Sequence, residues 1–219
     1  MLYAVILCLL ISCTIAHVPQ QTFLTNASLS GISKVAIVVT VSAPDVSYSR
    51  DAQSVSANNP IPLLAFIGLL NTGVRSSIDY SHSSNIKERI NFSYLEEKTA
   101  ELFIQPLKQG GCFQTIVHVA NKEQDDRQWA TAGYDAVIHL FVREISLKRA
   151  AGDNVNLWIY VQGQMTSLAS ETIIWDREEF VSSSVPHPLD YYKENGQQEI
   201  VALLEKAIKK LDYDFVYLK

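Results

Sequence analysis

The chain has 219 residues, 47% of them apolar and 19% charged, which is enough for one well-buried core but cramped for two full domains. Its formal charge is -5 and its 18 lysines and arginines are scattered, so it lacks the clustered positive charge with which proteins bind nucleic acid. Its three cysteines, Cys8, Cys13 and Cys112, are too few for a small secreted domain held by disulfides.

The first sixteen residues are almost wholly apolar and indicate an export signal, because a transmembrane helix needs roughly 20 such residues. Two cleavage sites compete within them. Leu10-Ile11-Ser12-Cys13 resembles the lipobox of bacterial lipoproteins, whose cysteine is acylated before the chain is cut in front of it, whereas Thr14-Ile15-Ala16 fits an ordinary signal peptidase. An uncleaved membrane anchor is the third alternative.

We expect the lipoprotein alternative, with residues 1–12 as the signal peptide and Cys13 as the lipidated residue, carrying acyl chains such as palmitate. Residues 17–32 are rich in Ser, Thr, Gln and Asn, and residues 13–32 are expected to form a flexible tether, followed by a single domain over 33–219. Thr14 stands where an Asp would signal inner-membrane retention in many Gram-negative lipoproteins, so the outer membrane is the expected location.

The domain begins with a strand and a long insertion. Lys34 to Val41 is a continuous β-branched run that predicts a central strand covered on both faces, and the insertion follows at about 45–84. Within it, Ile61 to Leu70 is strongly apolar but would be only about 15 Å long as a helix, too short to cross a bilayer. It predicts either a short helix packed on the sheet or an apolar loop that dips into the membrane interface or docks a partner. In the second case the contacts would come from Leu63, Leu64, Phe66, Ile67 and Leu69.

The next segments alternate between helix and strand. Apolar residues at helical spacing predict a helix over 86–105, stopped by Pro106 and Gly110-Gly111. A strand over 112–120 and a short helical piece around Trp129 are expected to follow.

The second half reads as strands over 136–147, 155–165 and 171–181 and an amphipathic helix over 196–211. The strand 155–165 alternates strictly, with Val155, Leu157, Ile159 and Val161 predicted inward and Asn156, Trp158, Tyr160 and Gln162 outward. Gly152-Asp153-Asn154 is typical of a turn, so this strand and the preceding one should form an antiparallel hairpin. The whole order predicts an α/β sandwich of two layers: a mixed, mostly antiparallel sheet with two main helices packed on it.

This order of elements, together with several short phrases, resembles a broad group of bacterial envelope lipoproteins that includes the curli-secretion and peptidoglycan-synthase-activator lipoproteins. The phrases are KVAIVV in the first strand, GGCF at 110–113, AGYDAVI at 132–138 and ETIIW at 171–175, and the likeness covers about Ser33 to Leu218. It implies a small mixed α/β domain that is anchored by a lipid and acts through protein contacts without catalysis. The insertion at 45–84 departs from the group, and its apolar part is too short to build a pore.

Motifs for chemistry are missing from the sequence. The five histidines never occur at metal-ligand spacing, and there is no HExxH, no paired cysteines, no G-x-S-x-G elbow and no S-x-x-K pair. We therefore expect no catalytic residues, no metal and no cofactor. The alternative is an envelope hydrolase or transferase with an unmarked site, such as His139 with nearby carboxylates.

A binding surface has better candidates, because Trp158 and Tyr160 share a strand face with Gln162 and Gln164. Such a mixture of aromatic and amide groups stacks on sugar rings or contacts proteins, unless the last helix covers that face and the aromatics are core. The sequence thus predicts a lipid-anchored protein of the bacterial cell envelope that faces the periplasm and serves as a non-catalytic interaction or assembly module. Its expected partners are the membrane and an envelope protein, and the second alternative is a periplasmic protein that binds a small ligand or glycan.

Overall fold

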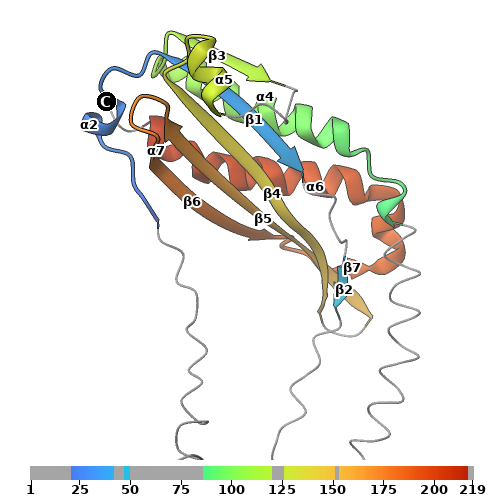
Figure 1. Cartoon of the computed structure of the whole chain (residues 1–219). Coiled ribbons are helices and arrows are strands. Elements are labelled where there is room, and N and C mark those ends of the chain that lie inside the picture. Colours follow the sequence, from blue (N-terminus) through green and yellow to red (C-terminus); the bar gives the residue numbers. More distant parts are fainter. Residues whose placement is uncertain (1–20, 42–46, 50–85, 120–125, 151–152, 217–219) are drawn as a thin grey trace, which may run out of the picture.

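The computed structural model describes residues 21–41, 47–49, 86–119, 126–150 and 153–216. In this part of the chain a mixed sheet carries its main strands in the order β3-β1-β4-β5-β6 (Figure 1). These strands are β1 (Lys34–Val41), β3 (Thr115–Val119), β4 (Ala136–Arg149), β5 (Asn154–Ser167) and β6 (Thr172–Ser182). Strand β1 is parallel to its neighbours β3 and β4, while β5 is antiparallel to its neighbours β4 and β6. The predicted mixed sheet and the predicted hairpin are therefore confirmed.

Two long helices form the second layer. Figure 1 shows α4 (Phe92–Gly110) and α6 (Leu189–Leu211) side by side behind the sheet. Between the layers lies an aromatic centre in which Trp175 of β6 contacts Phe103 of α4 and Phe215 of the short α7 (Tyr213–Val216), with ring centroids 6.2 and 4.8 Å apart. Burying several such rings removes a large apolar area from water and stabilises the packing of the helices on the sheet.

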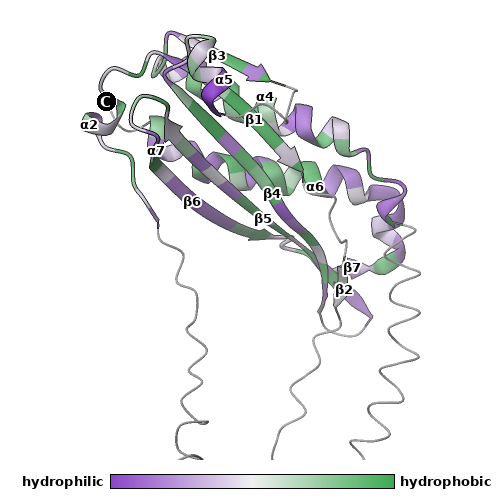
Figure 2. Ribbon diagram, in the orientation of Figure 1, coloured by the Kyte–Doolittle hydropathy of each residue, from purple (hydrophilic) through white to green (hydrophobic). Residues whose placement is uncertain are grey.

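Strand β1 is central and covered on both faces, as its β-branched sequence predicts, and Figure 2 shows it hydrophobic over much of its length. Val35, Ile37 and Val39 belong to the core under the two long helices. Ala36 and Val38 form a second, small cluster with Trp129 of α5 (Asp126–Thr131), which lies on the opposite face of the sheet. The short helix predicted around Trp129 therefore covers the second face of β1.

Both ends of α4 differ from the predicted range 86–105. The helix begins after Asn91, whose side chain accepts a hydrogen bond from the Tyr94 amide, and it passes through Pro106 to end at Gly111 in a left-handed conformation with φ 65°. A proline inside a helix costs about 3 kcal/mol through a lost hydrogen bond and a steric clash. Phe103 and Leu107 are both completely buried on the core side, and their burial offsets that cost.

Helix α6 also begins earlier than predicted, at Leu189 instead of Gly196, directly after Pro188. Tyr192 explains the extra turns, because its ring is buried and its hydroxyl donates a hydrogen bond to the Val155 carbonyl at 3.2 Å. The buried Tyr192 therefore holds the first turns of α6 on the sheet, although Asn195-Gly196 in the sequence indicates a helix boundary.

The N-terminal part of the described chain packs on the domain before residue 33. Leu24 is buried in the main core, and Thr22 exchanges two backbone hydrogen bonds of 3.0 Å with Asp176 on the outer edge of β6. A one-turn helix, α2 (Asn26–Leu29), follows and is capped by the side chain of Thr25. The packed domain therefore includes residues 21–32 of the segment that was expected to be tether.

Short strands complete the sheet: β2 (Ser47–Ser49) pairs with β4, and β7 (His187–Pro188) pairs with β5. The apolar segment 61–70 and the proposed lipid site Cys13 lie outside the described residues. No helix within the described ranges is long and apolar enough to cross a bilayer.

Candidate functional site

The face of β4, β5 and β6 that points away from α4 and α6 is called here the open face. Leu157, Ile159 and Val161 of β5 are buried under the helices, so the alternate residues of the same strand point to the other side. Among the described elements, only α5 lies over this side, at the end where β4 begins (Figure 1). Strand pairing places its residues in rows: His139, Gln164 and Asp176; Phe141, Gln162 and Glu178; Glu144, Tyr160 and Phe180; Ser146, Trp158 and Ser182.

One half of the open face is aromatic. The rings of Tyr160 and Phe180 stack nearly parallel, with centroids 4.3 Å apart, and Phe180 is 56% exposed. Trp158 lies in the adjacent row, with the ammonium of Lys148 4.8 Å from its ring centroid. Burial and a hydrogen bond to Glu178 raise the pKa of Tyr160, so its hydroxyl stays a neutral donor at all physiological pH values.

The other half is polar and internally connected. Arg143 donates two hydrogen bonds to the Gln162 side-chain oxygen, at 3.1 and 2.7 Å, and its guanidinium lies 4.4 Å from the Phe141 ring centroid. Gln162 in turn donates to Asp176 at 2.9 Å, and Gln164 donates to the other oxygen of Asp176 at 3.4 Å. These contacts fix the polar side chains in place before anything binds, which lowers the entropy lost on binding.

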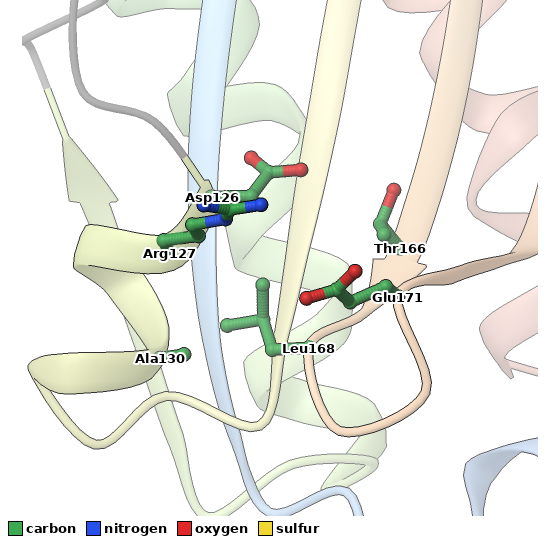
Figure 3. A pocket seen from close by; sticks show the side chains of 6 residues that line it. All are labelled: Asp126, Arg127, Ala130, Thr166, Leu168 and Glu171. Atoms are coloured by element: carbon green, nitrogen blue, oxygen red, sulfur yellow. The ribbon is translucent and has the colours of Figure 1, made fainter.

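A cleft opens at the end of the open face, between α5 and the β5–β6 hairpin. It has a volume of about 260 Å³ and is lined by Asp126, Arg127, Ala130, Thr166, Leu168 and Glu171. Figure 3 shows the charged side chains of α5 on one side and Glu171 and Thr166 on the other. His139 of β4 contacts one of these lining residues, with its Nε2 3.3 Å from Oδ1 of Asp126.

The predicted site residues are divided between these features and the part of the chain outside the described ranges. Trp158 and Tyr160 lie on the open face, and the alternative that the last helix covers them is wrong, because α6 covers the opposite face. His139 meets one carboxylate, that of Asp126. Leu63, Leu64, Phe66, Ile67 and Leu69 lie outside the described residues, as does Cys13.

Sequence reasoning missed Phe141, Arg143, Asp176 and Phe180. A register shift between Val142 and Glu144 in β4 makes the alternation change face within the strand, so strict period-two counting fails there. A second shift in the β5–β6 pairing lies between Met165 and Thr166. The alternation of residues along a strand predicts which side of the sheet each of them points to. It does not predict which residues of neighbouring strands lie opposite one another, because that pairing depends on these bulges.

The described residues contain no cluster of three or more histidine, cysteine, aspartate or glutamate side chains placed to hold a metal ion. The arrangement instead offers stacking surfaces, amides and charged groups, which are groups that recognise another molecule.

Comparisons with known proteins give no match among family models or curated proteins. Solved structures with similar shape include PelC from Paraburkholderia phytofirmans, described as a dodecamer, with 11% identity and a TM-score of 0.41 over 84% of this chain and 87% of that chain. Protein XCC0632 from Xanthomonas campestris has 9% identity and a TM-score of 0.38 over 89% and 87% of the two chains. Lipoprotein GNA1162 from Neisseria meningitidis has 12% identity and a TM-score of 0.32 over 83% and 99%. Similarity at these identities and TM-scores does not indicate what this chain does.

Proposed function

We propose that this chain is a lipid-anchored protein of the bacterial cell envelope that acts without catalysis as an interaction module, and that its open face binds an envelope protein. The observation that carries the proposal is the exposed stack of Phe180 on Tyr160, beside Trp158 and next to the ordered Arg143–Gln162–Asp176 network. Aromatic residues and arginine are the residue types enriched in protein interfaces, and they dominate the binding energy there.

The chemistry of the open face indicates which groups of a partner would fit it. The aromatic half fits an apolar side chain of the partner, and the polar half fits main-chain or amide groups that complete the hydrogen bonds of Arg143, Gln164 and Asp176. Because these polar side chains already bond one another, few rotamers remain to be ordered on binding. A prearranged face of this kind suits a protein surface.

The N-terminal segment connects the open face to the membrane. Thr22 pairs with Asp176 of β6, so the first described residues lie along the edge strand of this face. Residues 13–21 span at most about 30 Å when fully extended, which would hold the face within that distance of a lipid on Cys13. One acyl chain anchors a protein only marginally and additional chains make the anchor durable, so a fully acylated Cys13 is expected.

Site-specific photo-crosslinking tests the interaction. A photoreactive phenylalanine analogue at Phe180 or Trp158, in cells with the full chain, should crosslink one and the same envelope protein. The same analogue at Tyr94, a 43% exposed residue on the helix layer, is the matched control and should give no such product. Equal crosslinking from Tyr94, or a product consisting only of a second copy of this chain, would overturn the proposed partner.

The anchor is tested separately by the intact mass of the membrane-extracted protein and by Cys13→Ala. Lipidation predicts a mass that begins at Cys13 and carries acyl groups, and release of the alanine variant from the membrane. A mature chain that begins at His17 with no added mass would reject lipidation while leaving the role of the open face in place.

A further inference from the structure

The cleft beside α5 has two fixed walls. Helix α5 is held by Trp129, which is buried against the sheet and meets Tyr134 edge to face at 5.8 Å between ring centroids. The opposite wall is held by Leu168, whose amide donates a 2.9 Å hydrogen bond to the Asp135 carbonyl. The cleft is therefore formed before a ligand arrives.

The walls carry charges of both signs that face the cleft. Asp126 is held by His139, whereas Arg127 and Glu171 have no ion-pair partner among the described residues. Glu171 adopts φ 54°, a left-handed conformation that is unfavourable for a residue with a side chain, at the turn that aims its carboxylate at the cleft (Figure 3). Thr166 adds a hydroxyl, and Ala130 and Leu168 supply apolar surface.

We propose that this cleft binds a small zwitterion, a molecule with an ammonium and a carboxylate group on the scale of an amino acid. The ammonium is placed between Asp126 and Glu171, and the carboxylate is bound by the guanidinium of Arg127. The volume of about 260 Å³ lies just below the roughly 300–1,000 Å³ of sites for drug-sized ligands, which suits a ligand of this size.

Other ligand classes fit the charges less well. A simple anion would pair with Arg127 but would be repelled by both carboxylates. A simple amine would pair with the carboxylates and leave Arg127 without a partner. A divalent metal would need several clustered ligands, and the described residues provide no cluster of three suitable side chains. A zwitterion pairs with both signs at once, through charge-assisted hydrogen bonds.

Saturation-transfer NMR on the full chain in detergent micelles tests the proposal, because it detects weak binding of small molecules. Alanine, as the probe, should give a transfer signal with a dissociation constant on the order of millimolar, as expected for a few charged contacts in an open cleft. N-acetylalanine, which lacks the ammonium, and alaninamide, which lacks the carboxylate, should each bind at least about tenfold more weakly, a loss typical of one missing charged contact.

Two variants locate the binding. Arg127→Gln and Glu171→Gln should each abolish the alanine signal, whereas the charge-matched changes Lys206→Gln on α6 and Glu97→Gln on α4 should leave it unchanged. Both control residues are exposed on the helix layer. A signal from N-acetylalanine or alaninamide as strong as that from alanine, loss of the alanine signal in the control variants, or no alanine signal at all would overturn the proposal. None of these outcomes affects the crosslinking expected from Phe180.

Discussion

Among the described glycines, Gly163 has the least room for a side chain. It lies on the helix side of β5, and a β-carbon built there would be 2.3 Å from Cη2 and 2.6 Å from Cζ3 of Trp175. Carbon atoms in contact are normally about 3.5–4.0 Å apart, so the indole would have to retreat by more than about 1 Å. The ring has no room to do so, because Phe103 and Phe215 pack on it and its N–H donates to Asp214 at 3.0 Å.

Gly163→Ala should therefore lower the free energy of unfolding by about 3 kcal/mol, from overpacking and a weakened hydrogen bond to a charged group. Urea denaturation followed by circular dichroism should show the midpoint falling by about 1.5 M. Gly196→Ala is the matched control: its β-carbon would meet nothing closer than 3.9 Å, and better helix propensity should stabilise α6 by up to about 1 kcal/mol.

The clash itself is tested by a double-mutant cycle with Trp175→Leu, which removes the ring atoms that the new methyl group meets. In that background Gly163→Ala should change the free energy of unfolding by less than about 1 kcal/mol. If Gly163→Ala in the otherwise unchanged protein loses less than about 0.5 kcal/mol, the reasoning from this contact is refuted.

Two further predictions concern carboxylates of the C-terminal region. Burial raises the pKa of Asp212 from 3.8 to about 6, so the folded state holds the proton more tightly than the unfolded state does. The free energy of unfolding should therefore fall as pH rises between these values, by at most about 3 kcal/mol. Urea denaturation at a series of pH values should show that Asp212→Asn flattens this pH dependence. The same pH dependence in the variant and the unchanged protein would contradict the argument. Asp214→Ala removes the 2.9 Å ion pair with the largely buried Arg177 and should destabilise the protein by about 3 kcal/mol in urea denaturation. Asp190→Ala, whose side chain is 83% exposed in its pair with Lys193, should change stability by less than about 0.5 kcal/mol, and equal effects of the two would count against the burial argument.

Part of the candidate site follows from local pattern. The alternation of β5 is sufficient to place Trp158 and Tyr160 on the side away from Ile159, because successive side chains of a strand point to opposite faces. It does not give Phe180, which reaches Tyr160 only through the antiparallel register of β5 and β6. That register depends on a turn and a bulge, whose positions a single strand's pattern does not fix.

The cleft illustrates a stronger limit. Asp126 and Glu171 are separated by more than forty positions, and each follows a segment without a recognisable motif. They come together because Trp129 fixes α5 on one side and the bond from Leu168 to Asp135 fixes the hairpin on the other. Contacts of this kind are long-range, so composition and periodicity carry no signal for them.

The sequence by itself determined the strands, the two long amphipathic helices and the two-layer class, because hydrophobic periodicity is a local property that burial on one face imposes. Tertiary structure alone decided which face of the sheet the helices cover, where α4 and α6 begin and end, and that Leu24 belongs to the core. These outcomes depend on how well distant side chains fill one shared volume, and a window of neighbouring residues contains no information about that volume.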